Sequence, residues 1–158
     1  MTLKEIENWS HRVFNYLNGF VNPSFKVGSL KITVFGTDHA RYVNATNPHM
    51  SYIAINPRLI EQTFKPEYIP RIIVDIMIHE LTHAEQKLNW RSYSNDIDYK
   101  DKIEANAVKR TYEFVQRNKE RLEKDLHIEV IEGPLSIDCF KDNVMNEILE
   151  DIKRKNKD

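Results

Sequence analysis

Cysteine is nearly absent from this chain of 158 residues, and the single Cys139 cannot form a disulfide within it. Apolar runs are also short: no segment approaches the roughly 20 apolar residues of a membrane-spanning helix, and no apolar leader follows Met1. Glycine (four) and proline (six) are sparse, and no repeat, low-complexity tract or linker interrupts the chain. These absences predict a reduced, soluble, cytoplasmic protein without a membrane partner.

The chain also lacks an excess of charge of either sign. It carries 23 Lys and Arg against 24 Asp and Glu, a net charge of −1 at pH 7. Proteins that bind nucleic acid usually neutralise phosphates with an excess of basic side chains, so we expect no nucleic-acid partner. The basic residues between 109 and 124 are interspersed with glutamates at helical spacing, which is typical of a solvated helix face. At this length we expect one domain, residues 1–158.

The most informative feature present is an HExxH pentapeptide, residues 79–83. Histidines four residues apart lie on one face of an α-helix, about one turn from each other, so both imidazoles can bind a single ion. Zinc accepts imidazole nitrogen readily and lowers the pKa of a bound water to about 7. The motif therefore predicts Zn²⁺ as cofactor, His79 and His83 as its ligands, and Glu80 as the general base that takes a proton from a zinc-activated water.

The residues before the motif indicate a buried helix. Apolar residues between 71 and 78 cover nearly the whole helical circumference, which is typical of a helix in the interior of a domain. A β-branched run of this kind also suits a central strand, but the polar continuation to Lys87 favours a helix from Glu67 or Pro70 to Asn89. Buried polar side chains need partners. A metal ion would be one shared partner for His79, Glu80 and His83. The alternative is two ordinary histidines that hydrogen-bond to neighbours.

A catalytic zinc usually has three protein ligands and one open position. The metzincin pattern would require glycine at position 86 and histidine at position 89, where this chain has Gln86 and Asn89. Glu104 is the preferred third ligand, because it opens a second helical pattern. The small residues Ala105 and Ala107 next to it would let two helices approach closely enough to share an ion.

Other residues compete for these roles. Asp98 and Asp101 could bind zinc, although each also suits a helix cap or first turn. His127 would complete a three-histidine site, but it is isolated in a polar junction. Tyr99 and Tyr112 could each donate a hydroxyl hydrogen to a developing oxyanion, but tyrosines on amphipathic helices more often pack at the core boundary.

The motif resembles that of the gluzincins, zincin-like metallopeptidases in which an HExxH helix is followed by a second helix with a Glu ligand. The matching residues are His79, Glu80, His83, Glu104 and either Ala105 or Ala107. Small bacterial and phage proteins of the ImmA/IrrE type are similar in size and in their Glu-Ala helix. The similarity covers residues 50–115. After Ala107 the usual Phe-Ala continuation is missing, and the loop 90–98 also differs.

The resemblance implies a zincin-like α+β fold, with a small, mostly antiparallel sheet packed on a central HExxH helix. An amphipathic helix with a capping box at Thr2–Glu5 should precede this sheet and end near Gly19. Alternating patterns predict strands at 30–35, 41–45 and 50–55 in a meander, and Asn56-Pro57 closes the last one. In zincins an edge strand pairs with the extended substrate, and 50–55 is our candidate for it. The alternative is an ordinary sheet strand without a substrate role.

After the metal helix, the sequence predicts further helical structure. The expected elements are a helix over 99–124, a short strand over 127–131, a break at Gly133-Pro134, and an amphipathic helix over 137–152 with a frayed tail over 153–158.

These observations together predict a zinc metallopeptidase that hydrolyses peptide bonds in a protein or peptide substrate, with a narrow intracellular target if the ImmA/IrrE resemblance holds. One alternative is a non-catalytic zincin-like protein that uses the metal for stability or binds a partner through its cleft. The intact Glu80 favours the enzyme, because a purely structural site has no need of that carboxylate. A metal-free helical interaction protein that carries the motif by chance is a third interpretation.

Overall fold

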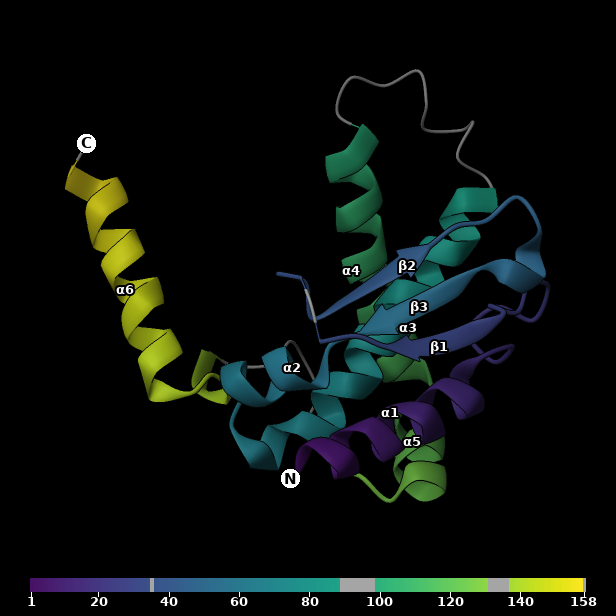
Figure 1. Cartoon of the computed structure of the whole chain (residues 1–158), viewed down its shortest axis with the longest axis horizontal. Coiled ribbons are helices and arrows are strands. Elements are labelled where there is room, and N and C mark those ends of the chain that lie inside the picture. Colours follow the sequence, from purple (N-terminus) through teal and green to yellow (C-terminus); the bar gives the residue numbers. More distant parts are fainter. Residues whose placement is uncertain (35, 89–98, 131–136, 158) are drawn as a thin grey trace.

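The computed structural model describes residues 1–34, 36–88, 99–130 and 137–157, and it shows an α+β arrangement (Figure 1). The helices of these residues are α1 (Leu3–Leu17), α2 (Pro57–Thr63), α3 (Ile69–Leu88), α4 (Tyr99–Arg117), α5 (Lys119–Leu126) and α6 (Asp142–Lys157). The strands are β1 (Ser29–Ile32), β2 (Ala40–Val43) and β3 (Tyr52–Ile55). Short 3₁₀ helices are η1 (Pro48–Met50), η2 (Pro66–Tyr68) and η4 (Ile137–Cys139).

Helix α1 has the capping box that the sequence predicts. The Thr2 hydroxyl oxygen accepts from the Glu5 amide at 3.1 Å, and the Glu5 carboxylate accepts from the Thr2 amide at 3.0 Å. Gly19 follows the C-terminus with a φ of +87°, a conformation that glycine adopts without strain. The apolar side of α1 faces the core, and its fully buried residues are Ile6, Val13 and Leu17.

The sheet corrects the prediction of an antiparallel meander. Its strand order is β1-β3-β2, with β1 parallel and β2 antiparallel to β3, so the sheet is mixed. The strand near 50–55 therefore lies in the centre, and its assignment as the edge strand was wrong. Composition explains the order: β3 reads Tyr-Ile-Ala-Ile without a charge, whereas β1 contains Lys31 and β2 contains Arg41. Charged side chains suit the edges of a sheet.

Helix α3 confirms the helical interpretation of the run before the motif. It packs against α1, α4, η2 and β2, so most of its circumference is covered by other elements. The buried apolar residues of this helix are Ile69, Ile72, Ile73, Val74, Met77, Ile78, Leu81 and Ala84. In Figure 1, α3 passes behind the sheet, with α1 and α4 on either side of it. The HExxH residues thus belong to a helix that the rest of the fold holds in place.

Asn56 and Pro57 do more than close β3, because they also begin α2, a helix that was not predicted from the sequence. The Asn56 side chain accepts from the Leu59 amide at 3.1 Å, and Pro57 occupies the first turn. Both residue types are typical of helix N-termini. The same dipeptide therefore ends a strand and starts a helix.

The C-terminal third of the chain differs from its prediction in three places. The expected helix over 99–124 is divided at Asn118, whose side-chain amide donates to the Phe114 carbonyl at 2.9 Å and competes with the helical backbone. Residues 127–130 are not a strand, and His127 has a left-handed backbone with a φ of 54°. Helix α6 begins at Asp142 and not at 137, because Ile137–Cys139 form the 3₁₀ helix η4, and it continues to Lys157 instead of fraying after 152. The predicted break at 133–134 lies outside the described residues.

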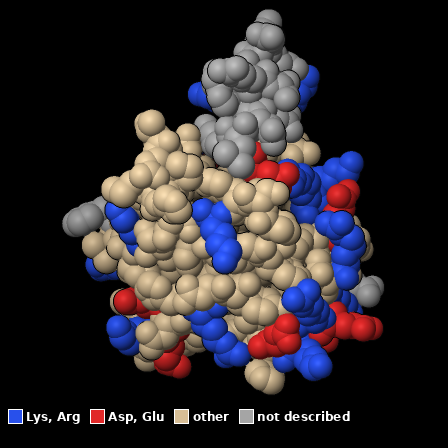
Figure 2. Space-filling model, turned by 90° about the vertical axis from the view of Figure 1, so that its right-hand side faces the viewer, with Lys and Arg blue, Asp and Glu red and all other residues tan. Residues whose placement is uncertain are grey.

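On the face shown in Figure 2, acidic and basic side chains of the described residues intermingle, without a large area of one sign. Helix α6 projects away from the sheet and its covering helices (Figure 1). None of the helices in the described part of the chain combines the length and the apolar character needed to cross a membrane.

Candidate metal centre

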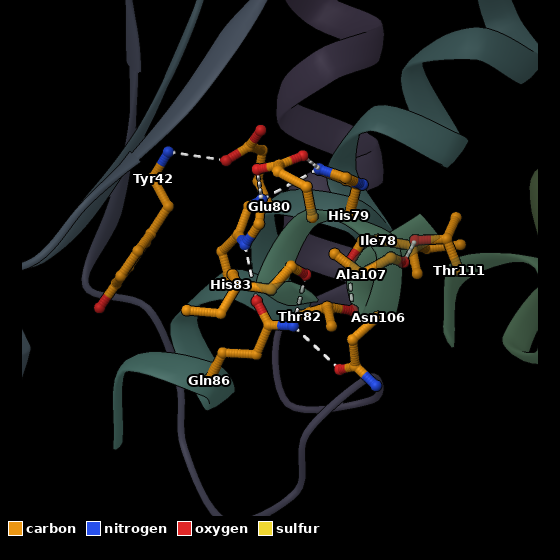
Figure 3. A network of polar contacts seen from close by, with 12 residues as sticks. Tyr42, Ile78, His79, Glu80, Thr82, His83, Gln86, Asn106, Ala107 and Thr111 are labelled. Carbon is orange, nitrogen blue, oxygen red and sulfur yellow. Dashed lines mark hydrogen bonds and ion pairs between the residues drawn. The ribbon is translucent and has the colours of Figure 1, made fainter. Parts of the chain in front are cut away.

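The structure brings together the three side chains that the sequence nominates as metal ligands. The Nε2 atoms of His79 and His83 are 3.0 Å apart. The two carboxylate oxygens of Glu104 lie 3.2 Å from His79 Nε2 and 2.8 Å from His83 Nε2. In Figure 3 the two imidazoles from α3 point toward one another. Tetrahedral zinc with Zn–N distances of about 2.0–2.1 Å separates its ligand atoms by about 3.3 Å, close to these three distances.

Helix packing explains why Glu104 reaches the histidines. Helix α4 packs along α3, and Ala107 is fully buried one turn after Glu104. Ala105 is exposed, so Ala107 is the small residue that allows the close approach of the two helices. Glu104 itself remains 61 % exposed at its side chain, which leaves the cluster open to solvent on the α4 side.

The electrostatics of the cluster suit a cation. Two imidazole nitrogens 3.0 Å apart repel each other if both present lone pairs, unless a proton or a metal ion lies between them. Burial, and secondarily the neighbouring His83, lower the pKa of His79, although Glu104 acts in the opposite direction. His79 is therefore neutral near pH 7 and has a lone pair to offer. Two imidazole nitrogens and one carboxylate are a donor set that zinc accepts, so these residues fit the predicted ion.

Gln86, whose side chain is not that of the metzincin pattern, orients His83. Gln86 is 2 % exposed, and its side-chain NH₂ group donates to the Ile103 carbonyl and to the Asn106 side chain, each at 2.9 Å. Both acceptors belong to α4 (Figure 3 shows Asn106). The amide oxygen of Gln86 must then face His83 Nδ1, 2.7 Å away, and accept its N–H. This bond leaves the lone pair of His83 on Nε2, the atom that faces Glu104.

Replacing Gln86 by methionine should weaken zinc binding by about 10–100-fold, the usual effect of losing a hydrogen-bond partner behind a metal-binding histidine. Methionine has a similar volume but neither fixes the tautomer of His83 nor ties α3 to α4. The measurement is competition for zinc with a chromophoric chelator. The exposed Gln62 of α2 provides the control, since Gln62→Met should retain the affinity of the wild type. Equal affinities for all three proteins would contradict the role of Gln86.

Glu80 lies beside the cluster and contacts the sheet. Its side chain is largely buried, and one carboxylate oxygen accepts from the Tyr42 amide of β2 at 2.8 Å (Figure 3). Burial is the main reason why the pKa of Glu80 is raised, although His83 and the Tyr42 amide partly oppose it. A raised pKa makes the carboxylate a stronger base at neutral pH. The Tyr42 contact was not predictable from sequence, because it depends on β2 being the edge strand next to α3.

The residues around Glu80 enclose a cleft of about 530 Å³. Its walls come from β2, α3 and the first turns of α4, and the three candidate ligands all line it. Clefts of about 300–1,000 Å³ are typical of ligand-binding sites. The candidate base and ligands therefore face a space that a substrate could enter.

The competing ligands do not join the cluster in the described part of the chain. Asp101 is an exposed residue in the first turn of α4, and His127 lies at the C-terminus of α5. Asp98 is outside the described residues, as is the side chain of Tyr99. The Tyr112 hydroxyl accepts from Gln116 at 2.8 Å. Among the described residues, Glu104 is thus the carboxylate that meets the two histidines.

A buried ion pair continues the same face of α3 toward its N-terminus. Asp75 lies one turn before His79, and Arg71 lies one turn further. Arg71 Nε is 3.4 Å from an oxygen of Asp75. Burial raises the pKa of Asp75 to about 6, although Arg71 acts to lower it.

This pKa predicts a pH dependence of stability. The unfolded state has an ordinary aspartate pKa of about 3.9, so between about pH 4 and pH 6 the folded state binds more protons, and its stability falls as the pH rises. Asp75→Asn removes this contribution. The variant should therefore gain up to about 3 kcal/mol of unfolding free energy relative to wild type between pH 4 and pH 7. Urea unfolding of chelator-treated proteins measures it. Asp101→Asn, at an exposed position, should show no such change, and a pH-independent difference for Asp75→Asn would contradict the prediction.

Comparison of the chain with protein-family models, curated proteins and solved structures finds no match. The chemistry of the site must therefore be judged from the HExxH motif and from the geometry of the described residues.

Proposed function

We propose that the chain is a zinc-dependent metallopeptidase with a zincin-like fold, in which His79, His83 and Glu104 hold the ion. The observation that carries the proposal is the convergence of these side chains within hydrogen-bonding distance of one another, with Glu80 next to them on the same cleft. Zinc, when bound there, would supply a Lewis acid that polarises the scissile carbonyl and activates a water. A protein or peptide is the expected substrate.

In this proposal Glu80 moves the protons. One of its oxygens accepts from the Tyr42 amide, and this bond holds the carboxylate against the cleft. The other oxygen takes a proton from the attacking water and later delivers it to the nitrogen of the leaving amine, so the carboxylate is regenerated at the end of the cycle. Burial of a glutamate with a raised pKa and no ion-pair partner among the described residues is costly to the fold, which favours a catalytic role.

The strand that would bind an extended substrate is β2 and not β3. Strand β2 is an edge of the sheet, packs beside α3, and lines the cleft with Ala40, Arg41 and Tyr42. The His39 carbonyl accepts from the Asn56 amide of the neighbouring chain segment at 2.8 Å. Since hydrogen-bonded positions alternate along an antiparallel strand, the main-chain N–H and C=O groups of Ala40 and Tyr42 point away from β3, to the free edge of the sheet. An edge of this kind can pair with a peptide backbone. Because the Tyr42 amide donates to Glu80, the proposed base lies at that edge.

The test compares one preparation of the protein in two states. Zinc-loaded protein and protein stripped with chelator are incubated with a peptide library prepared from a proteome digest, and new peptide termini are identified by mass spectrometry. New termini with the loaded protein alone, restored when the stripped protein is reloaded, would support the proposal. Identical termini in both states would contradict it. A protein that holds one zinc per chain but generates no termini would favour the non-catalytic alternative.

A further inference from the structure

A second cavity adjoins the candidate metal centre. It has a volume of about 480 Å³, and His79 and Glu80 line both spaces. Its walls are mainly apolar and include Ile76 of α3 and Val108 and Val115 of α4. Val108 is 60 % exposed and Val115 only 6 %, so the cavity deepens from Val108 toward Val115. The size and lining are those of a pocket for a small group.

The polar residues that α3 contributes to this pocket lie at regular distances from the candidate ion along the helix axis. His79, Asp75 and Arg71 follow each other at intervals of four residues along one face of α3, and all three line the pocket. Each interval is about 6 Å along the helix axis. A group bound at the metal centre therefore meets Asp75 if it extends into the pocket by about one helical turn.

Asp75 presents an acceptor that lacks a donor. One of its oxygens lies near the Arg71 guanidinium, and the other is buried without a hydrogen-bond partner among the described residues. Buried acceptors in this state are uncommon, because the lost hydration is not replaced. Since Arg71 already balances the charge of Asp75, a ligand needs to bring a hydrogen-bond donor but no charge.

We propose that this pocket receives the substrate side chain next to the cleaved bond and selects an uncharged side chain with an apolar stem and a donor at its tip, tyrosine above all. This inference rests on the proposed peptidase function. The ring of tyrosine would pack between Ile76, Val108 and Val115, and its hydroxyl would donate to Asp75. Phenylalanine would leave the Asp75 oxygen without a partner. Lysine would bring an additional charge into a mainly apolar pocket beside Arg71, at a desolvation cost.

The test measures binding and does not require cleavage. Hydroxamic acids chelate zinc, and their tails can be varied. Acetohydroxamic acid carries the chelating group alone, and the other probes are 3-phenylpropanohydroxamic, 3-(4-hydroxyphenyl)propanohydroxamic and 6-aminohexanohydroxamic acid. Dissociation constants for the zinc-loaded protein are measured by calorimetry. The hydroxyphenyl compound should bind about tenfold more tightly than the phenyl compound, the usual effect of one hydrogen bond to a charged acceptor. The amino compound should bind more weakly than either.

Two variants identify the acceptor. Asp75→Ala should bring the ratio of the phenyl and hydroxyphenyl dissociation constants close to one. Asp38→Ala should preserve the ratio, because Asp38 borders the same pocket with a side chain that is 60 % exposed. If Asp75→Ala does not fold, the wild-type ratio still decides the matter.

The possible failures are distinguishable. A wild-type ratio near one, or tightest binding of the amino compound, would overturn the inferred preference while leaving the metal centre intact. No binding even of acetohydroxamic acid would overturn the proposed zinc site and the pocket preference with it.

Discussion

Replacing Glu80 by glutamine should lower the rate of peptide cleavage by about 10²–10⁴-fold, the usual contribution of a positioned general base. Glutamine has nearly the same volume, and its amide oxygen can still accept from the Tyr42 amide. It cannot take a proton from water near pH 7. Zinc content and thermal stability should therefore stay close to those of the wild type, and the loss should fall on kcat. The measurement is the cleavage rate of a peptide identified in the library experiment.

The pH profile gives this prediction a second readout. Glu80 must be ionised to act as a base, and its pKa is raised by burial. The kcat/KM profile of the zinc-loaded wild type should therefore have an acidic limb, on which the rate rises as the pH rises through the pKa of Glu80. The residual activity of Glu80→Gln should lack this limb, and an unchanged limb in that variant would assign it to another group.

The matched control is Glu85→Gln on the same helix. Glu85 pairs with Arg110 of α4 and does not line either cavity, so this variant should retain the wild-type rate. If both variants lost activity equally, a general disturbance of α3 would explain the result. Undiminished cleavage by Glu80→Gln would assign the activity to other residues or to a contaminant.

Wild-type protein should hold about one zinc per chain, and His79→Ala should hold almost none. Removal of the ion by a chelator should lower the melting temperature, because zinc binds the folded state and only weakly the unfolded chain. At a free zinc concentration 1,000-fold above the dissociation constant, the stabilisation is about 4 kcal/mol. For a domain of this size that corresponds to roughly 8–16 °C. Metal analysis and thermal unfolding with and without chelator measure the two effects.

Carboxylate variants test the third ligand in the same assay. Glu104→Gln should weaken zinc retention, because the amide is a poorer ligand than the carboxylate that faces both histidines. Asp101→Asn, in the first turn of the same helix, should not. If Asp98→Asn or Asp101→Asn released the ion instead, Glu104 would be the wrong ligand. A melting temperature of the wild type that is insensitive to the chelator would argue against a tight site.

Features that depend on neighbours along the chain were predictable without the structure. The capping box of α1 needs only Thr2 and Glu5, and the juxtaposition of His79 and His83 needs only helical periodicity. The buried character of α3 followed from its apolar circumference. Glu104 was a prediction from its small neighbours, and the packing of α4 on α3 places it against both histidines.

A sharper reading of helical spacing could have found two further residues. Gln86 lies three residues after His83 and Asp75 four residues before His79, so both share the ligand face of α3. The role of each residue on that face depends on α4. Ile103 and Asn106 of α4 orient the Gln86 amide, and Val108 and Val115 of α4 line the same pocket as Asp75.

Strand order lay beyond the sequence because pairing depends on contacts between distant segments. Alternating patterns located three strands but did not reveal that the chain passes from β1 to β2 and then inserts β3 between them. That order makes β2 the edge strand and brings the Tyr42 amide to Glu80. Local periodicity placed the histidines and the base on one helix, whereas only the tertiary packing of β2 and α4 against that helix assembled the cleft around them.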